Sequence, residues 1–552
     1  MKKLLALALS CMMLISCFAG CSGGNQDTAN NTGNNTASQN NSTNDTANDD
    51  AADPNEPVYG GELKVAINRS IAADALDPVV ANGTHCDQVV LQYGQTLVEE
   101  NAEATDYIPC LATDWTISDD GLVYTFTIRE GVHFQKGEFQ DGREMTAEDV
   151  VYSLNRAHEL SWWGYLPFFD HAEVTEDGKV ACYLESANAT FLHELTSPSG
   201  IIIPQEEVEG QGNQFGATPI GTGPFQVVEH VPDQYTKLEK NPDYWGPEPY
   251  LDGITYYIIT DTAQTMNALT TGEVDAVLSV TGTNIQLVKN DSNLQLVQSP
   301  TNSIYYLGFN LSDPVLSDQR VRDAIAMAID REQVAAAAYT DGDGIVSYLP
   351  VPTTSWGYDE SLVDLVPPYD PEGAKALLAE AGYGDGLTLA LTIDESETKV
   401  RAATVIQAQL SQIGVNVQID NLTATEVTDR YLNNQVQLWI GGQSGSADPG
   451  TFVGNFLSTA KMHTNYNAFC YSDPDTDAII AQASAEIDQD VRAELYNELI
   501  KIAIEDNIGV FYGTTYLSWG LNSRVHGFVQ ENKAVMKVCG IEGTGINIWV
   551  TD

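Results

Sequence analysis

The chain has 552 residues, and its 77 acidic side chains against 25 basic ones give a formal net charge of −52 at pH 7. Such a charge repels nucleic-acid phosphates and anionic membrane surfaces, which argues against both as partners of the folded surface. Apolar residues make up 43% of the chain, enough for large cores, so wholesale disorder is excluded. The length suggests about two to four domains.

Residues 1–20 have the pattern of a secretory signal peptide. Lys2 and Lys3 precede an uncharged apolar run from Leu4 to Phe18, and two small residues separate that run from Cys21. The ending resembles a lipoprotein cleavage site, at which Cys21 would become the N-terminus and carry the lipid. An uncleaved membrane helix is the alternative, but the run is near the lower limit for crossing about 30 Å of hydrocarbon.

Residues 21–57 join this cysteine to the body of the protein. After Cys21 they are rich in Asn, Thr, Ser, Ala, Asp and Gly and contain no Lys or Arg, so we expect a disordered tether. The tether holds six acids and the signal two lysines, which leaves a net charge of −48 on the body from Val58 onwards. We therefore expect an acidic folded body outside the cytoplasm, held by lipid at the outer face of the cell membrane.

A strand–helix–strand unit is predicted near the middle of the chain. Residues 254–259 are rich in β-formers, Asp261 or Thr262 can cap a helix that ends near Gly272, and residues 274–280 alternate as a strand. Further helices are predicted after Asp318 and after Asp370-Pro371, where a capping residue precedes a proline at the first helical position.

A second unit of the same kind follows. It consists of a strand at residues 387–393, a helix at 400–413 that Gly414 ends, and an alternating strand at 415–419. Crossovers of this kind imply parallel pairing and helices that cover the sheet. Because the two units lie far apart in the chain, we predict two α/β lobes rather than one sheet.

Five cysteines remain in the body: Cys86, Cys110, Cys182, Cys470 and Cys539. Their number is odd, so at least one has no partner within the chain, and the absence of a C-x-x-C pair argues against zinc or redox motifs. The five cysteines could be mostly buried thiols, or two of them could form a single disulfide, and the sequence does not choose between these alternatives.

The catalytic motifs that the sequence approaches are incomplete. The metalloprotease pattern H-E-x-x-H is incomplete at His158 and His193, and the hydrolase pattern G-x-S-x-G around Ser444 has Ser446 in place of its second glycine. Three acids from Asp473 onwards imitate a calcium loop without its glycine and glutamate, so we interpret them as acids at a helix N-terminus. We expect no enzyme activity, no metal and no cofactor.

Several motifs in order give the body a family resemblance. They are Gly60-Gly61-Glu62-Leu63, Leu76-Asp77-Pro78, Ser118-Asp119-Asp120-Gly121, Thr146-Ala147-Glu148-Asp149-Val150, Pro219-Ile220-Gly221-Thr222-Gly223-Pro224-Phe225, Asn241-Pro242-Asp243-Tyr244-Trp245, Ala328-Ile329-Asp330-Arg331 and Leu377-Leu378-Ala379-Glu380-Ala381-Gly382-Tyr383. From Gly60 to Gly527 the chain resembles extracytoplasmic solute-binding protein family 5, the oligopeptide, dipeptide and nickel receptors of ABC importers. Most motif residues are expected to be scaffold: Trp115, Tyr124, Phe126 and Phe134 in the core, and Arg322 and Asp330 in surface pairs.

The resemblance implies an α/β, two-lobed periplasmic-binding-protein-like fold with a hinge and an extra inserted domain. The first lobe would comprise residues 58–92, 201–300 and 509–552, the inserted domain 93–200, and the second lobe 301–508. Ligand would bind between the lobes and favour the closed form, which a permease and ATPase complex would recognise. A monomer is expected.

One ligand position departs from the family pattern. Peptide-binding members place an aspartate, which holds the α-ammonium of the peptide, three residues before an acidic–Pro pair. Here the pair is Asp448-Pro449 and the position is Gly445, while Gln443 and Ser444 are neutral. A buried ammonium needs a charged or well-placed acceptor. Either another acid replaces the missing one or the ligand lacks this group, and Gly445→Asp is expected to strengthen binding of free-amine peptides.

Other candidate contacts come from the same resemblance. Arg430 aligns with an arginine at the cleft of some peptide receptors and is suited to a carboxylate, with a surface arginine as the alternative. Thr84, Trp163, Tyr306 and Tyr512 are further candidates, for which core or hinge packing is the alternative. Trp439 is expected in the core.

The expected function is a lipid-anchored receptor that delivers peptides or peptide-like solutes to an ABC importer. A glycan or metal-chelate ligand is the alternative within the same fold. A receptor that signals or acts as a chaperone is a second alternative, which the absence of a neighbouring permease and ATPase operon would favour. A secreted hydrolase is a third, which Ser444→Ala would test by loss of turnover.

Overall fold

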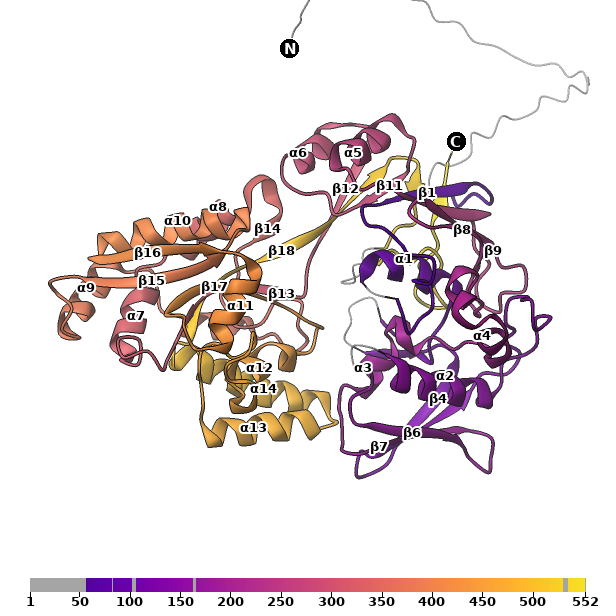
Figure 1. The fold of residues 1–552 in the computed structure, drawn as a ribbon, viewed down its shortest axis with the longest axis horizontal. Helices are drawn as coiled ribbons and strands as arrows, with labels where there is room; N and C mark the ends of the chain where they lie inside the picture. Colours follow the sequence, from indigo (N-terminus) through magenta and orange to yellow (C-terminus); the bar gives the residue numbers. More distant parts are fainter. Residues whose placement is uncertain (1–55, 82, 102–105, 162–164, 530–534, 552) are drawn as a thin grey trace, which may run out of the picture. The chain divides into compact units, whose positions relative to one another are not determined.

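The computed structural model describes residues 56–81, 83–101, 106–161, 165–529 and 535–551. Its largest sheet is formed by β1 (Glu62–Ile67), β8 (Phe225–Val231), β9 (Tyr235–Lys240), β10 (Gly253–Ile258), β11 (Ala276–Leu278), β12 (Leu294–Pro300), β13 (Ser303–Phe309), β14 (Gly344–Ile345), β15 (Leu387–Asp394), β16 (Val415–Leu422), β17 (Leu438–Ser444) and β18 (Gly509–Asn522). Their order is β16-β15-β17-β13-β18-β11-β1-β10-β9-β8, and β12 and β14 also pair with β18 (Figure 1).

The long strand β18 belongs to two parts of this sheet. Its beginning, Gly509–Gly513, pairs with β13, and its end, Tyr516–Asn522, pairs with β12. We call the part built on β1 and β8–β12 the first lobe, and the part built on β13 and β15–β17 the second lobe. The predicted two lobes are present, but their sheets are not separate, because one strand is long enough to carry the ladder from one lobe into the other.

Both predicted crossover units are present. In the first, α5 (Thr262–Thr271) begins at Asp261, whose carboxylate accepts from the Gln264 amide, and ends at Gly272 with φ 73°. Its two strands, β10 and β11, lie parallel on either side of β1. In the second, α10 (Glu397–Gln412) connects β15 and β16, which pair in parallel with each other.

Helices cover both faces of the second lobe's sheet. On one face lie α7 (Gln319–Met327), α8 (Arg331–Ala338), α9 (Pro371–Glu380) and α10; on the other lie α12 (Val453–Leu457), α13 (Pro474–Ala485) and α14 (Gln489–Glu505). Successive strand residues point to opposite faces. Leu307 therefore packs in the core on the α7–α10 side of the sheet, and Tyr306 packs in the core on the α12–α14 side. A strand buried on both faces reads as an apolar run without alternation.

The inserted region carries a sheet of its own. Within the described residues it has the antiparallel order β4 (Ala112–Ile117), β5 (Val123–Ile128), β7 (Val180–Leu184) and β6 (Phe169–Val174), and α2 (Ala147–Leu160) packs on β6. Tyr124, Phe126 and Phe134 are buried there, as expected, in a core that is continuous with β1 of the first lobe, whereas Trp115 is only partly buried against this core.

The remaining elements belong to the two lobes and the inserted region. They are α1 (Thr84–Tyr93), β2 (Val98–Glu100), β3 (Tyr107–Pro109), α3 (Phe191–Leu195), α4 (Gln205–Gln211), α6 (Thr283–Asn290), α11 (Ala424–Leu432), β19 (Val525–His526) and β20 (Trp549–Val550). Of the helices in the described ranges, none is at once long and apolar enough to cross a membrane.

Two further details answer questions that the sequence raised. Among the described residues, Cys110, Cys182, Cys470 and Cys539 are free thiols; Cys470 is half-buried, whereas the other three and Cys86 are buried. The expected surface pair at Arg322 is wrong. Its side chain is 5% exposed and donates to the carbonyl oxygens of Asp506 and Asn507, which follow the end of α14. The cation thus stabilises the negative end of a helix.

Candidate functional site

A cavity of about 630 Å³ is lined by both lobes. From the first lobe and the inserted region come Thr84, Asp87, Leu91, Glu100, His193, Thr196, Ser197, Pro198, Ser299, Pro300, Leu517 and Val535; from the second come Thr301, Asn302, Ser444, Gly445, Ser446 and Ala447. Several of these residues lie where elements end or begin: Glu100 ends β2, Asn302 precedes β13 and Ser444 ends β17. The cavity is therefore built from segments far apart in the sequence.

The loop after β17 supplies the second lobe's side of the cavity. The amide of Gly445 donates to the Asn302 carbonyl oxygen over 3.0 Å, which fixes the loop beside β13. A Cβ atom at Gly445 would lie 2.5 Å from Thr451 Oγ1 and 2.9 Å from Thr451 Cβ. Any side chain here must therefore displace Thr451. The predicted gain in binding of free-amine peptides by Gly445→Asp therefore requires that Thr451 move.

Acidic groups lie on the opposite side of the cavity. The Glu100 side chain contacts His193, with 2.5 Å between Oε1 and Nδ1, and Glu100 is 8% exposed. Burial raises the pKa of Asp87 to about 7. Among the described residues that line the cavity there is no arginine or lysine. The lining thus favours a positive ligand group over a negative one.

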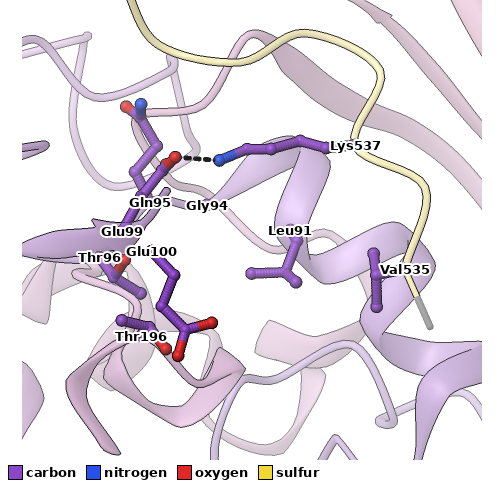
Figure 2. Close-up of a pocket in the computed structure, with 9 residues that line it drawn as sticks. All are labelled: Leu91, Gly94, Gln95, Thr96, Glu99, Glu100, Thr196, Val535 and Lys537. Carbon is purple, nitrogen blue, oxygen red and sulfur yellow. Dashed lines mark hydrogen bonds and ion pairs between the residues drawn. The ribbon is translucent and has the colours of Figure 1, made fainter. Parts of the chain in front are cut away.

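A small cavity of about 40 Å³ adjoins this acidic side and shares Leu91, Glu100, Thr196 and Val535 with the larger one (Figure 2). The lysine that lines it, Lys537, is ion-paired with Glu99, and the two side chains point toward each other in Figure 2. The charge of this lysine is therefore already balanced by a protein carboxylate.

A second neighbour, of about 180 Å³, shares Glu100, His193 and Ala447 with the larger cavity. It is lined by Arg492, whose guanidinium binds the Asp448 carboxylate. The cations on both flanks of the main cavity are thus neutralised within the protein.

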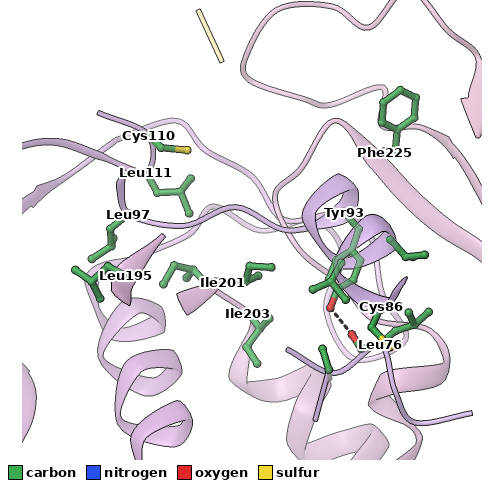
Figure 3. Packing of buried hydrophobic residues seen from close by; sticks show 14 of the residues in the cluster. Leu76, Cys86, Tyr93, Leu97, Cys110, Leu111, Leu195, Ile201, Ile203 and Phe225 are labelled. Carbon is green, nitrogen blue, oxygen red and sulfur yellow. Dashed lines mark hydrogen bonds between the residues drawn. The ribbon is translucent and has the colours of Figure 1, made fainter. Parts of the chain in front are cut away.

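Helix α1 positions Asp87 by its amphipathic pattern. Thr84, Asp87 and Leu91 are spaced three and four residues apart and line the cavity, whereas Cys86 and Tyr93 lie on the face that packs into the core (Figure 3). The Tyr93 hydroxyl donates to the Leu76 carbonyl oxygen over 2.6 Å, so the helix is tied to the segment before it (Figure 3).

Three of the residues predicted from the family resemblance line the cavity: Thr84, Ser444 and Gly445. Gln443 precedes them on β17, and its side-chain amide donates to the Ser444 carbonyl oxygen over 2.8 Å. Trp163 and Cys21 lie outside the described residues.

The other three predicted residues lie elsewhere. Tyr306 is 2% exposed in an aromatic cluster with Trp439, Phe469 and others, and Trp439 itself is buried as expected. Tyr512 is fully buried in the core on the opposite face of the sheet. Arg430 on α11 forms an ion pair of 2.7 Å with Asp420. For the two tyrosines, packing accounts for the burial.

Sequence reasoning missed Asp87, Glu100, His193 and Asn302. The spacing from Thr84 through Asp87 to Leu91 was a usable signal, because it places one acid on the same helical face as a predicted contact. Nothing in the sequence brings Glu100 to His193, which lies 93 positions away.

Comparison with known proteins identifies the family. Residues 106–464 match the model for the middle region of bacterial extracellular solute-binding proteins, family 5, and the chain belongs to this family. The dipeptide-binding protein of Escherichia coli (strain K12) is 30% identical over 446 residues, which cover 76% of this chain and 82% of that protein.

Two solved structures show the same two-lobed fold. HbpA2 from Haemophilus parasuis has a TM-score of 0.81 at 26% identity, covering 89% of this chain and 100% of that one. The ABC transporter-associated periplasmic binding protein DppA from Helicobacter pylori, solved in complex with the peptide STSA, has a TM-score of 0.66 at 25% identity and covers 89% and 98%. These relatives are binding proteins rather than enzymes.

Proposed function

We propose that this protein is a lipid-anchored receptor that captures peptides or peptide-like solutes between its lobes and delivers them to an ABC permease and its ATPase. The observation that carries the proposal is the cavity of about 630 Å³ lined by both lobes. Its volume falls within the range of about 300–1,000 Å³ that is typical of small-molecule sites. The names of the Escherichia coli and Helicobacter pylori relatives support a peptide ligand.

The arrangement of the strands supports capture by closure. A ligand that contacts residues of both lobes binds more tightly when the lobes close on it, and only this difference in affinity shifts the equilibrium. The lobes are joined at the junction of β12 and β13 and through β18, where the Thr301 amide donates to the Thr515 carbonyl oxygen over 2.9 Å. Few residues need to change backbone angles at such a hinge.

Anchoring belongs to the same proposal. Cys21 follows the apolar run and two small residues, and a tether separates it from the first strand. One acyl chain binds a membrane only marginally, so stable attachment requires more than one chain on this cysteine. The receptor would act as a monomer at the outer face of the membrane, without a nucleic-acid partner or a cofactor.

The test uses the mature lipoprotein in detergent. Mass spectrometry of ligand released from the natively purified protein, followed by thermal unfolding with a mixed library of short peptides, is expected to show bound peptide and a raised Tm. Thermal stabilisation by oligosaccharides or metal chelates, with none from the peptide library, would overturn the peptide proposal in favour of those ligands.

A further inference from the structure

We propose that the first lobe, through Asp87 and Glu100, binds a ligand ammonium group in place of the second-lobe carboxylate that Gly445 lacks. This inference rests on the proposed function and specifies its ligand: a solute with a free ammonium group. Both acids line the same cavity of about 630 Å³ as Gly445.

The second lobe has no carboxylate to offer at this position. Its loop contributes Ser444, Gly445, Ser446 and Ala447, and a side chain at 445 would collide with Thr451. The next acid, Asp448, is 7% exposed and is held by Arg492. What remains on this side is a set of hydroxyl and backbone groups, which bind neutral parts of a ligand.

The first lobe supplies the opposite chemistry. Within the described part of the chain, the Asp87 carboxylate has no hydrogen bond or ion pair, although it lines the cavity and is partly buried. Glu100 adds a second carboxylate beside His193. A buried carboxylate is stabilised by an opposite charge, and a ligand ammonium that enters the cavity would supply it with charge-assisted hydrogen bonds.

The same lining predicts what is not recognised. The nearby cations Lys537 and Arg492 are bound by Glu99 and Asp448, and Arg430 is bound by Asp420. A ligand carboxylate therefore meets no unbalanced cation among these three. Affinity is expected to depend on the ammonium group and hardly on a free C-terminal carboxylate.

Protonation of Asp87 should make ligand binding depend on pH. Burial raises the pKa of Asp87 to about 7, so the neutral carboxyl predominates at lower pH and the carboxylate at higher pH. Glu100 on β2 and His193 on α3 line the cavity with it, and His85 lies on its own helix. Ionised Asp87 attracts an ammonium and neutral Asp87 does not, so affinity should rise as pH rises through 7.

The experiment compares three synthetic tripeptide libraries by native mass spectrometry: free at both ends, N-acetylated, and C-terminally amidated. The wild-type lipoprotein is expected to bind the free and amidated libraries about tenfold more tightly than the acetylated one. Asp87→Asn should largely remove this preference, and Glu100→Gln should reduce it. The exposed Asp385→Asn is the matched control and should leave it unchanged.

The outcomes separate the two proposals. Equal binding of free and acetylated libraries by the wild type would overturn the ammonium inference and leave a peptide receptor. A preference that survives in Asp87→Asn and Glu100→Gln would overturn it too. Binding of no library would overturn the proposed function itself. If Asp87→Asn fails to fold, the affinity of the wild type for the free library is measured between pH 6 and about pH 8 instead. An affinity that does not rise over this range contradicts a role for Asp87.

Discussion

The Arg492 guanidinium donates to the Asp448 carboxylate over 2.6 Å in the interior of the second lobe, where both side chains are less than a tenth exposed. Asp448 also accepts from the Gly450 amide, and Arg492 donates to the Ala483 carbonyl oxygen at the end of α13. The guanidinium lies 4.9 Å from the centre of the Trp356 ring. This pair therefore fixes the loop after Gly445 to two helices.

Breaking this pair should destabilise the protein strongly. Asp448→Ala leaves a buried guanidinium without its counter-ion, and we expect a loss of about 3–5 kcal/mol in the free energy of unfolding. Urea unfolding measures it. The control is Glu239→Ala, which removes an exposed partner of Lys237 and should cost at most about 1 kcal/mol. Similar losses in both variants would show that Asp448 is not held as described.

Replacement of Asp87 should change the dependence of stability on pH. Burial raises its pKa from 3.8 to about 7, so the stability it contributes is full below 3.8 and is lost as pH rises through about 7. Asparagine imitates the neutral form at every pH. The Tm of Asp87→Asn relative to the wild type should therefore increase from about pH 4 to pH 7 and stay constant above pH 7. A Tm difference that is the same at pH 4 and pH 8 would contradict the burial of Asp87.

Capture of an ammonium by Asp87 should release a proton. A bound cation lowers the pKa of this carboxyl, so near pH 7 part of the population must ionise on binding. Calorimetry with the free tripeptide library in two buffers of different ionisation enthalpy should show different heats for the wild type. The heats that Asp87→Asn gives in the two buffers should differ less than those of the wild type. If they differ equally in both proteins, Asp87 is not the source of the released proton.

Gly445 should tolerate no side chain without cost. Gly445→Ala places a Cβ against Thr451 and should lower the free energy of unfolding by about 1–3 kcal/mol. Gly384→Ala is the matched control, because the Cβ there would lie 3.4 Å from Ala379 Cβ, an ordinary contact. If Gly445→Asp proves fully stable and binds free-amine peptides more tightly, the loop yields more easily than its packing indicates.

Loss of Cys21 should free the receptor from the membrane. Cys21→Ser removes the thiol that would carry the lipid, so the protein is expected to move from the membrane fraction to the soluble or secreted fraction. Fractionation with an antibody to the folded body measures this. Unchanged membrane association would favour the uncleaved helix instead.

Local signals in the sequence predicted the elements well. The side chains of Asp261 and Asp370 cap α5 and α9, and Gly272 and Gly382 adopt positive φ after these two helices, because such effects involve only a few neighbouring residues. The lining of the cavity was harder to predict from the sequence, since its acids come from separate elements that only tertiary packing brings together. Tyr306 shows the same limit: its environment depends on helices that follow it by more than a hundred residues.

The position of β18 has a consequence for how the chain matures. This strand lies near the C-terminus, yet it fills the sheet between β13 and β11. A polypeptide that crosses a membrane from its N-terminus therefore presents β1 and β13 outside long before their sheet can be completed. Contacts of such long sequence separation form slowly. Both halves should consequently reach their native state together after translocation ends, and until then exposed strand edges make the emerging chain a substrate for extracytoplasmic folding factors.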